Sequence, residues 1–157
     1  ALPISLGFAT AAKDTGYRAL AAETLATLAD RDMFDTYAFS AELMQLLKDK
    51  YVPANRVVET LQDAASISPL AGWRVCQVLQ GLLPVVGEIN RGGALVQLLA
   101  HLAGEYGVSV EIPEVLRLKM KGSTVLAKNL RALSTLSPHP TELAHQALEQ
   151  ANNTNPA

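Results

Sequence analysis

The chain has 157 residues, of which 49% are hydrophobic and only 5% aromatic. A chain of this length can bury roughly 70% of the surface that it exposes when unfolded, so we expect one domain with its own core. With few aromatic residues, that core must consist mainly of Leu, Ala and Val, which favours packed helices over a β-sandwich. The net charge of −2 excludes an overall positive field that would attract nucleic acid or an anionic membrane.

The single cysteine and the apolar runs of the sequence indicate a cellular setting. Cys76 cannot form an intrachain disulfide, and we expect it to be a buried, inert thiol. No apolar run reaches the roughly 18 residues of a membrane span, and the first residues lack the basic and apolar regions of a signal peptide. A soluble, cytoplasmic protein is therefore expected. The chain does not begin with Met, and both a processed form and a piece of a longer polypeptide stay open here.

The first third of the chain predicts helices separated by short polar breaks. A short apolar segment, residues 5–12, precedes a helix from about Asp14 to Arg31, which is followed by a third helix from Thr36 to Lys50 that ends before Pro53. Each helix carries apolar residues with the spacing of one buried face. These residues are Tyr17, Leu20, Ala21, Thr24, Leu25 and Leu28 in the helix that ends at Arg31, and Phe39, Leu43, Leu46 and Leu47 in the helix that begins at Thr36.

The centre of the sequence predicts a helical hairpin from Leu70 to Tyr106. A helix from about Ala54 to Ala65 leads into it, and Ser68 followed by Pro69 is a typical start for the first arm. Pro84 should kink or end that arm, and Gly92 and Gly93 should form the turn. Both arms repeat the spacing i, i+3, i+4, i+7, i+8, i+11, with Val75, Val78, Leu79, Leu82, Leu83 and Val86 in the first arm and Leu95, Leu98, Leu99, Leu102, Ala103 and Tyr106 in the second.

The last third of the chain predicts shorter elements. Residues 108–112 alternate apolar and polar residues, but with no partner strand elsewhere an extended connector is expected. A short helix from Pro113 to about Met120 and a helix from Val125 to Leu136 should follow, with a break at residues 122–123. Residues 137–140 form a stiff turn, residues 141–150 are either a capping helix or loosely held, and residues 151–157 should be disordered.

The spacing of these helices suggests a repeat. The second helix of each expected pair begins near Gly16, Asn55, Gly93 and Thr124, and the first two steps match the period of about 40 residues of HEAT-type repeats. We therefore predict an all-α fold of about eight to nine helices, stacked as antiparallel hairpins in a HEAT-like α-solenoid. Residues 1–137 would form the repeat domain, and residues 138–157 a capping helix and a disordered tail. An irregular helical bundle with chance spacings is the alternative.

Four segments also suggest a family: AELMQLL at 41–47, PANRVVETLQDAA at 53–65, WRVCQVLQGLLP at 73–84 and GSTVLAKNLRAL at 122–133. Their order resembles the C-terminal helical-repeat region of large, uncharacterised bacterial HEAT-like proteins, and the likeness covers roughly residues 5–136. The resemblance implies a cytoplasmic scaffold or adaptor region within a longer chain. It implies no catalytic residues.

Residues with catalytic or metal-binding chemistry are few in this sequence. It contains no nucleophile elbow, and it has no phosphate loop. His101 and Glu105 are four residues apart on one helix, but two ligands are too few for a zinc site, so a surface histidine is expected. The acidic residues Glu23, Asp30, Asp32 and Asp35 are expected to be a solvated rim. We predict no enzyme activity, no metal and no cofactor.

The basic stretch from residue 117 to 137 is the most distinctive charged feature, because it contains five cations and no acidic residue: Arg117, Lys119, Lys121, Lys128 and Arg131. A solvated helix face is the simplest interpretation. The favoured functional interpretation is that the stretch binds an acidic protein partner. Binding of nucleic acid is less favoured because the stretch has no aromatic side chains for stacking on bases. Further candidates for partner contact are Asn55, Arg56, Trp73, Arg74 and Arg91, since Trp and Arg are common binding hot spots.

The sequence thus leads to two main hypotheses of function, with nucleic-acid binding through the basic stretch as a weaker third. The first is a non-enzymatic scaffold or adaptor built from helical repeats, whose partner-binding residues are the five cations. The second is a helical-bundle enzyme or small-ligand-binding protein with a pocket between hairpins. A pocket with convergent polar groups and buried titratable residues would favour the second hypothesis. The sequence does not specify the partner or the oligomeric state.

Overall fold

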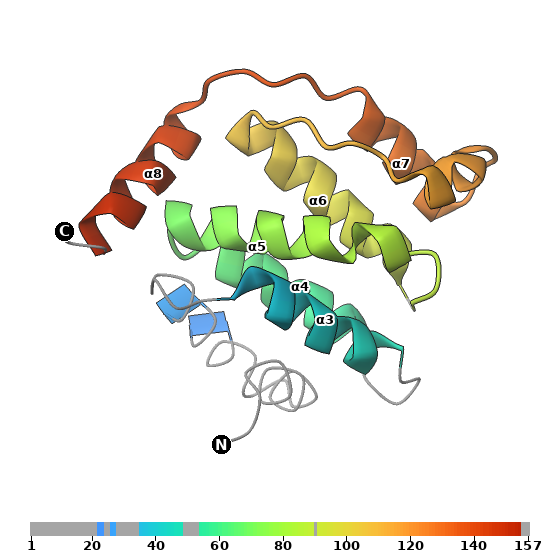
Figure 1. The fold of residues 1–157 in the computed structure, drawn as a ribbon, viewed down its shortest axis with the longest axis horizontal. Coiled ribbons are helices and arrows are strands. Elements are labelled where there is room, and N and C mark those ends of the chain that lie inside the picture. Colours follow the sequence, from blue (N-terminus) through green and yellow to red (C-terminus); the bar gives the residue numbers. More distant parts are fainter. Residues whose placement is uncertain (1–21, 24–25, 28–34, 49–53, 90, 155–157) are drawn as a thin grey trace.

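The described part of the computed structural model, residues 22–23, 26–27, 35–48, 54–89 and 91–154, is all helical and contains no strand. Figure 1 shows how the helices are arranged. The helices that lie wholly within the described ranges are α3 (Thr36–Leu47), α4 (Ala54–Ala65), α5 (Pro69–Leu82), α6 (Gly92–Tyr106), α7 (Val125–Ser134) and α8 (Glu142–Thr154), with 3₁₀ helices η2 (Leu83–Val85) and η3 (Glu114–Met120). The predicted all-α class is confirmed.

Helix α3 begins where the side chain of Asp35 caps it. The backbone N–H of Ala38 donates to Oδ1 of Asp35 at 3.0 Å, which satisfies a donor that the first helical turn leaves unpaired. Three of the predicted inward residues, Phe39, Leu43 and Leu47, are buried. The helix ends at Leu47, three residues before the predicted end at Lys50, and residues 49–53 lie outside the described ranges.

The ends of α5 are those that its sequence predicts. Ser68 adopts an extended backbone, and its hydroxyl oxygen accepts a hydrogen bond from the N–H of Ala71 at 3.0 Å, with Pro69 at the first helical position. The helix ends at Leu82, two residues before Pro84, and continues as the 3₁₀ helix η2. Proline cannot donate a main-chain hydrogen bond and clashes with the preceding turn, which explains this end.

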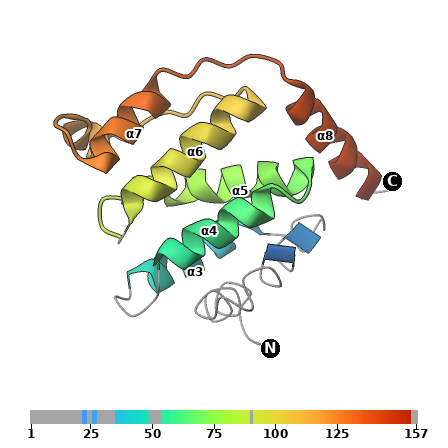
Figure 2. The same ribbon diagram turned by 180° about the vertical axis from the view of Figure 1, so that it is seen from behind.

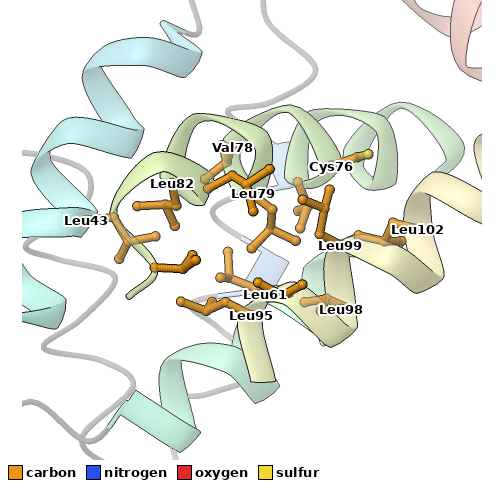
Figure 3. Close-up of a cluster of buried hydrophobic side chains, with 14 of the residues drawn as sticks. Leu43, Leu61, Cys76, Val78, Leu79, Leu82, Leu95, Leu98, Leu99 and Leu102 are labelled. Carbon is orange, nitrogen blue, oxygen red and sulfur yellow. The ribbon is translucent and has the colours of Figure 1, made fainter. Parts of the chain in front are cut away.

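Helix α5 is the centre of the fold, because it packs against α3, α4, α6 and α8 (Figure 2). Helix α6 packs against α4, α5, α7 and α8 in turn. Every residue of the two predicted apolar stripes is buried, from Val75 to Val86 in the first and from Leu95 to Tyr106 in the second. Figure 3 shows part of this cluster, in which leucines of α5 and α6 meet Leu43 of α3 and Leu61 of α4. The predicted central hairpin is confirmed.

The connection between α5 and α6 differs from the prediction in one detail. The residue with a left-handed backbone is Arg91, at φ 63°, and not one of the two glycines. Gly92 and Gly93 are the first residues of α6, where a Cβ atom on Gly92 would overlap the carbonyl of Val86 and one on Gly93 would lie 2.9 Å from the backbone N of Leu126. The glycines are therefore needed for close packing rather than for the turn.

An extended connector and a short helix follow α6. Residues 108–113 are neither helix nor strand, as expected, and the predicted short helix is the 3₁₀ helix η3, with Pro113 as the residue before it. Helix α7 begins after Thr124, whose side-chain oxygen accepts a hydrogen bond from the N–H of Ala127 at 3.0 Å. Helix α7 packs against both α6 and η3.

Helix α8 returns to the centre of the molecule. The chain between α7 and α8 passes over α6 to the opposite end of the fold (Figures 1 and 2), and the N–H of His139 donates to the carbonyl of Gly107 at 2.9 Å on the way. Helix α8 runs to Thr154, so residues 151–154, which we expected to be disordered, are helical. Packing against α5 and α6 explains this order, because it stabilises a helix that its sequence alone does not require.

Some predictions fall on residues that the structure does not describe. The segment 5–12 and all six stripe residues of the helix predicted from Asp14 to Arg31 lie outside the described ranges. Of that helix, residues 22–23 and 26–27 are described and are helical, with Ala22 and Ala26 buried. The expected count of eight to nine helices is therefore not tested.

Candidate functional site

The five predicted partner-binding cations lie on η3, on the turn after it and on α7, and η3 and α7 pack against each other. The fold thus brings the cations to one end of the molecule, and all five are exposed. We call them the basic surface; they are Arg117, Lys119, Lys121, Lys128 and Arg131.

The two arginines of the basic surface already have partners. Nε of Arg117 lies 2.7 Å from Oε2 of Glu114, one 3₁₀ turn earlier. The guanidinium of Arg131 donates to the carbonyls of Met120 and Gly122 at 2.7 and 2.8 Å, and so holds the turn between η3 and α7. Arg131 has a structural contact that its position in the sequence did not reveal.

The three lysines differ from the arginines. Within the described residues, no carboxylate lies within the 4.0 Å of an ion pair of Lys119, Lys121 or Lys128. The stem of Lys119 lies over Gly87, since its Cε would be 3.0 Å from a Cβ on that glycine. The basic surface therefore offers three ammonium groups to a partner, and its arginines contribute charge that is partly neutralised or fixed in place.

Two exposed apolar residues of η3 accompany these cations. In a 3₁₀ helix, residues i and i+3 lie on the same side, so Val115 and Leu118 form one ridge. Their exposed fractions are 67% and 81%. The sequence analysis missed this ridge because it assigned no face to the short helix; the spacing of two apolar residues among cations was the available signal.

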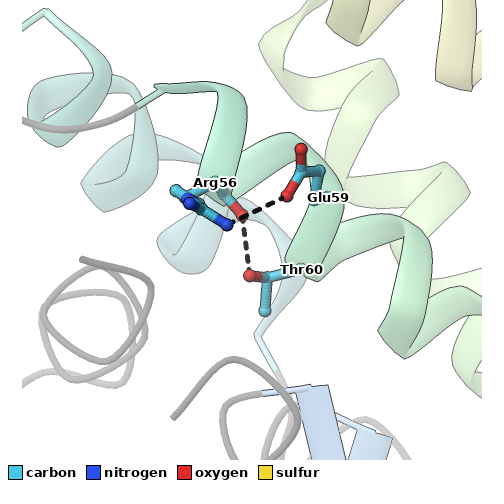
Figure 4. A network of polar contacts seen from close by, with 3 residues as sticks. All are labelled: Arg56, Glu59 and Thr60. Atoms are coloured by element: carbon cyan, nitrogen blue, oxygen red, sulfur yellow. Dashed lines mark hydrogen bonds and ion pairs between the residues drawn. The ribbon is translucent and has the colours of Figure 1, made fainter. Parts of the chain in front are cut away.

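Arg56 and Arg74, two of the other predicted contact residues, have local side-chain partners. Arg56 lies 3.7 Å from Glu59, and its carbonyl accepts a hydrogen bond from the hydroxyl of Thr60 at 2.7 Å (Figure 4). Nη1 of Arg74 donates to Gln77 at 3.0 Å. Asn55 and Arg91 are exposed. Asn55 and Arg56 lie on α4, Arg74 lies on α5 and Arg91 is the residue before α6.

Trp73 is half-buried, and its ring centroid lies 5.7 Å from that of Tyr106 at an interplanar angle of 51°. This geometry is a tilted aromatic contact between α5 and α6. Trp73 thus packs from α5 against α6, the other arm of the hairpin.

The histidines and carboxylates have surface contacts. His101 is exposed and pairs with Glu105, as expected, and His145 lies 3.0 Å from Glu149. Of the predicted acidic rim, Glu23 and Asp35 are exposed, whereas Asp30 and Asp32 lie outside the described ranges. In the part of the chain that the structure covers, no three His, Cys, Asp or Glu side chains gather as a metal site would require.

Two groups in the core have raised pKa values. Burial raises the pKa of the Cys76 thiol to about 11, against a lowering contribution from a hydrogen bond with Gln80. Burial, together with the nearby charge of Glu105, raises the pKa of Tyr106 to about 12. Both shifts favour the protonated form, and Cys76 is buried as we predicted.

An open groove of about 810 Å³ lies between α3, α5 and the connector after α6. Its lining is mixed, with Ser40, Gln77, Gln80 and Ser109 among the polar residues and Tyr37 and Trp73 among the aromatic ones. Its titratable carboxylate, Asp35, is the cap of α3. The groove thus has polar groups, but neither residue with a shifted pKa, Cys76 or Tyr106, lines it.

No helix of the described residues has both the length and the apolar character needed to cross a bilayer.

Comparison with known proteins gives one family. The model of the family described as "Domain of unknown function (DUF7825)" matches residues 2–101, which is more than half of the chain. Searches of curated proteins and of solved structures found no match. The match ends within α6, so the basic surface lies beyond it. On the strength of this match over residues 2–101, the chain belongs to the DUF7825 family.

Proposed function

We propose that this chain is a non-enzymatic interaction scaffold or adaptor of the cytoplasm, built from HEAT-like helical repeats, which binds an acidic protein partner through its basic surface. The observation that carries the proposal is the group of three exposed lysines, Lys119, Lys121 and Lys128, which have no carboxylate within ion-pair distance among the described residues. Charges that the fold does not use internally are available for complementary contact with a partner.

The helix contacts support the repeat architecture. Helix α3 packs against α5, and α4 packs against α6, as equivalent helices of successive repeats do in a stack. The pair of α3 and α5 thus forms a first row of helices, and the pair of α4 and α6 forms a second. Helix α6 then packs against α7, which extends the second row. The C-terminal end departs from this pattern, because α8 and not η3 lies against α5. In our proposal α8 caps the first row of helices at that end.

The test is affinity capture with the purified chain as bait and extracts of its own cells, followed by identification of the retained proteins. The charge-reversal variant Lys121→Glu/Lys128→Glu removes two cations of the basic surface without touching Arg131. Lys48→Glu is the matched control, since Lys48 is an exposed lysine at the end of α3. An acidic protein retained by the parent and by the control, and lost from the double variant, supports the proposal.

Retention that is equal for all three baits would overturn the assignment of the basic surface. Retention of nucleic acid in place of protein, with an affinity that falls steeply as salt rises, would favour the nucleic-acid hypothesis instead. Each capture is therefore run with and without nuclease.

The ligand-binding alternative rests on the groove of about 810 Å³ between α3 and α5. Its volume suits a small molecule, but its carboxylate is the cap of α3 and neither buried group with a raised pKa lines it. A thermal-shift screen of metabolites tests this alternative directly. A ligand that raises the unfolding temperature, with the effect removed by Gln77→Ala, would support it over the scaffold.

A further inference from the structure

We propose that the partner of the basic surface is an acidic protein segment that also carries apolar side chains, and that the ridge of Val115 and Leu118 anchors it. This inference rests on the proposed function, because it adds an apolar anchor to the same surface. It commits the partner to a chemistry, namely an apolar stripe with carboxylates that face the lysines.

The three sides of η3 carry this inference. One side holds Leu116, which is buried, and Lys119, whose stem lies over Gly87. A second side holds Glu114 and Arg117, which are paired at 2.7 Å. The third is the ridge of Val115 and Leu118. The ridge is thus flanked by Lys119 on one side and by the Arg117–Glu114 pair on the other.

Packing among the described residues does not explain the exposure of the ridge. Leu116 already fills the inward position of η3, so the helix does not need a second leucine for its packing. Scattered exposed apolar residues are ordinary, but here two lie one turn apart among cations. Such a combination of apolar centre and charged rim is the composition of a binding surface.

The charges select a protein segment over a lipid surface as the occupant. Arg117 is paired with Glu114, and the chain carries a net charge of −2, so a bilayer with a continuous negative surface would gain from few cations and repel the rest of the molecule. The ridge has two apolar side chains and no aromatic residue, which is little for insertion among lipids. A narrow acidic segment needs only the ridge and the lysines beside it.

The experiment measures binding of the full chain to three probes by fluorescence anisotropy or co-sedimentation. The first probe is a labelled peptide in which glutamates surround two leucines one helical turn apart. The second is polyglutamate of the same length and label, and the third is a vesicle of phosphatidylcholine and phosphatidylserine. Leu118→Ser removes the more exposed ridge residue, and Leu148→Ser on α8 is the control, since Leu148 is also an exposed leucine, at 61%.

We expect the chain to bind the leucine-containing peptide at least tenfold more tightly than polyglutamate, because a buried leucine side chain contributes that much or more. Leu118→Ser should remove this difference, and Leu148→Ser should preserve it. Lys121→Glu/Lys128→Glu should weaken binding of both peptides.

Equal binding of the two peptides, lost in the double lysine variant, would overturn the apolar anchor and leave the acidic-partner proposal standing. Binding of neither peptide would count against both. Binding to anionic vesicles in preference to the peptides would overturn the inference in favour of a membrane surface. Thermal unfolding of each variant shows whether its fold is intact, since the exposed positions should shift the midpoint by no more than a few degrees.

Discussion

Leu70 and Gln150, 80 residues apart in the sequence, are joined by a hydrogen bond in which the backbone N–H of Leu70 donates to the side-chain oxygen of Gln150 at 2.8 Å. Leu70 is the second residue of α5, where the N–H groups have no partner within the helix. Gln150 thus supplies from α8 a capping contact for the central helix, beside the one that Ser68 supplies to Ala71.

Gln150→Ala should therefore lower the free energy of unfolding by about 1 kcal/mol, because it leaves a half-buried N–H group without its acceptor. Gln146→Ala is the control, since Gln146 is an exposed glutamine on the same helix. Urea unfolding followed by circular dichroism measures both. A loss of the same size in the two variants would mean that the cap contributes nothing and that only helix propensity changed.

Gly107→Ala should be among the most destabilising single-methyl additions in this chain. Gly107 has φ +66°, and a Cβ there would overlap the carbonyl of His139 in the connector to α8. Gly122 has φ +99° with nothing within 4 Å of the added Cβ, so Gly122→Ala carries the backbone strain without the clash. We expect losses of about 2 to 5 kcal/mol at residue 107 and about 1 to 2 kcal/mol at residue 122.

Denaturant titrations of the two variants give these values. Equal losses would show that the connector moves aside freely, and would contradict the close contact of the connector with the end of α6.

Alkaline pH should destabilise the protein through Cys76. The pKa of its thiol is about 11 in the folded state against 9.0 for an ordinary thiol. At a pH between these two pKa values, the thiol has lost its proton in the unfolded chain and keeps it in the folded chain. The free energy of unfolding therefore has its full value below pH 9 and falls as the pH rises above 9. The thiol alone contributes a loss of roughly 2 kcal/mol by pH 11.

Chemical denaturation at intervals from pH 8 to 11 measures this dependence. Cys76→Ala should remove the loss of stability that begins at pH 9. It should keep the loss that comes from Tyr106, whose pKa is raised from 10.0 to about 12. An unchanged slope in Cys76→Ala would show that the thiol does not titrate differently in the two states. Labelling by iodoacetamide at pH 8 should be slow when the protein is folded and fast in urea.

Arg131 should contribute to the stability of the fold, whereas Lys128, which lies on the same basic surface, should not. Arg131→Ala removes two hydrogen bonds to the carbonyls of Met120 and Gly122 and should lower the free energy of unfolding by about 1 to 2 kcal/mol. Lys128→Ala should change it by less than about 0.5 kcal/mol, because this exposed lysine has no ion pair with a described residue. Thermal unfolding compares them, and a larger loss for Lys128→Ala would reverse our assignment.

The local sequence determined most of the helices and the core. Ser68, Pro69 and Pro84 set the ends of α5 through capping and the missing proline N–H, and the spacing of the apolar residues placed all twelve stripe positions of the hairpin in the core. Such features depend on neighbours within about one helical turn, which is why the sequence alone reveals them. The all-α class and the burial of Cys76 followed from composition and periodicity in the same way.

Only the tertiary structure decided which residues far apart in the chain meet. The order of α8 through Thr154 depends on its packing against α5 and α6, the glycines at residues 92 and 93 depend on the approach of Val86 and α7, and the role of Arg131 depends on two carbonyls in a preceding turn. The division of the basic surface into engaged arginines and available lysines has the same origin. Contacts of this kind arise from the three-dimensional arrangement of whole helices, which the periodicity of one segment does not encode.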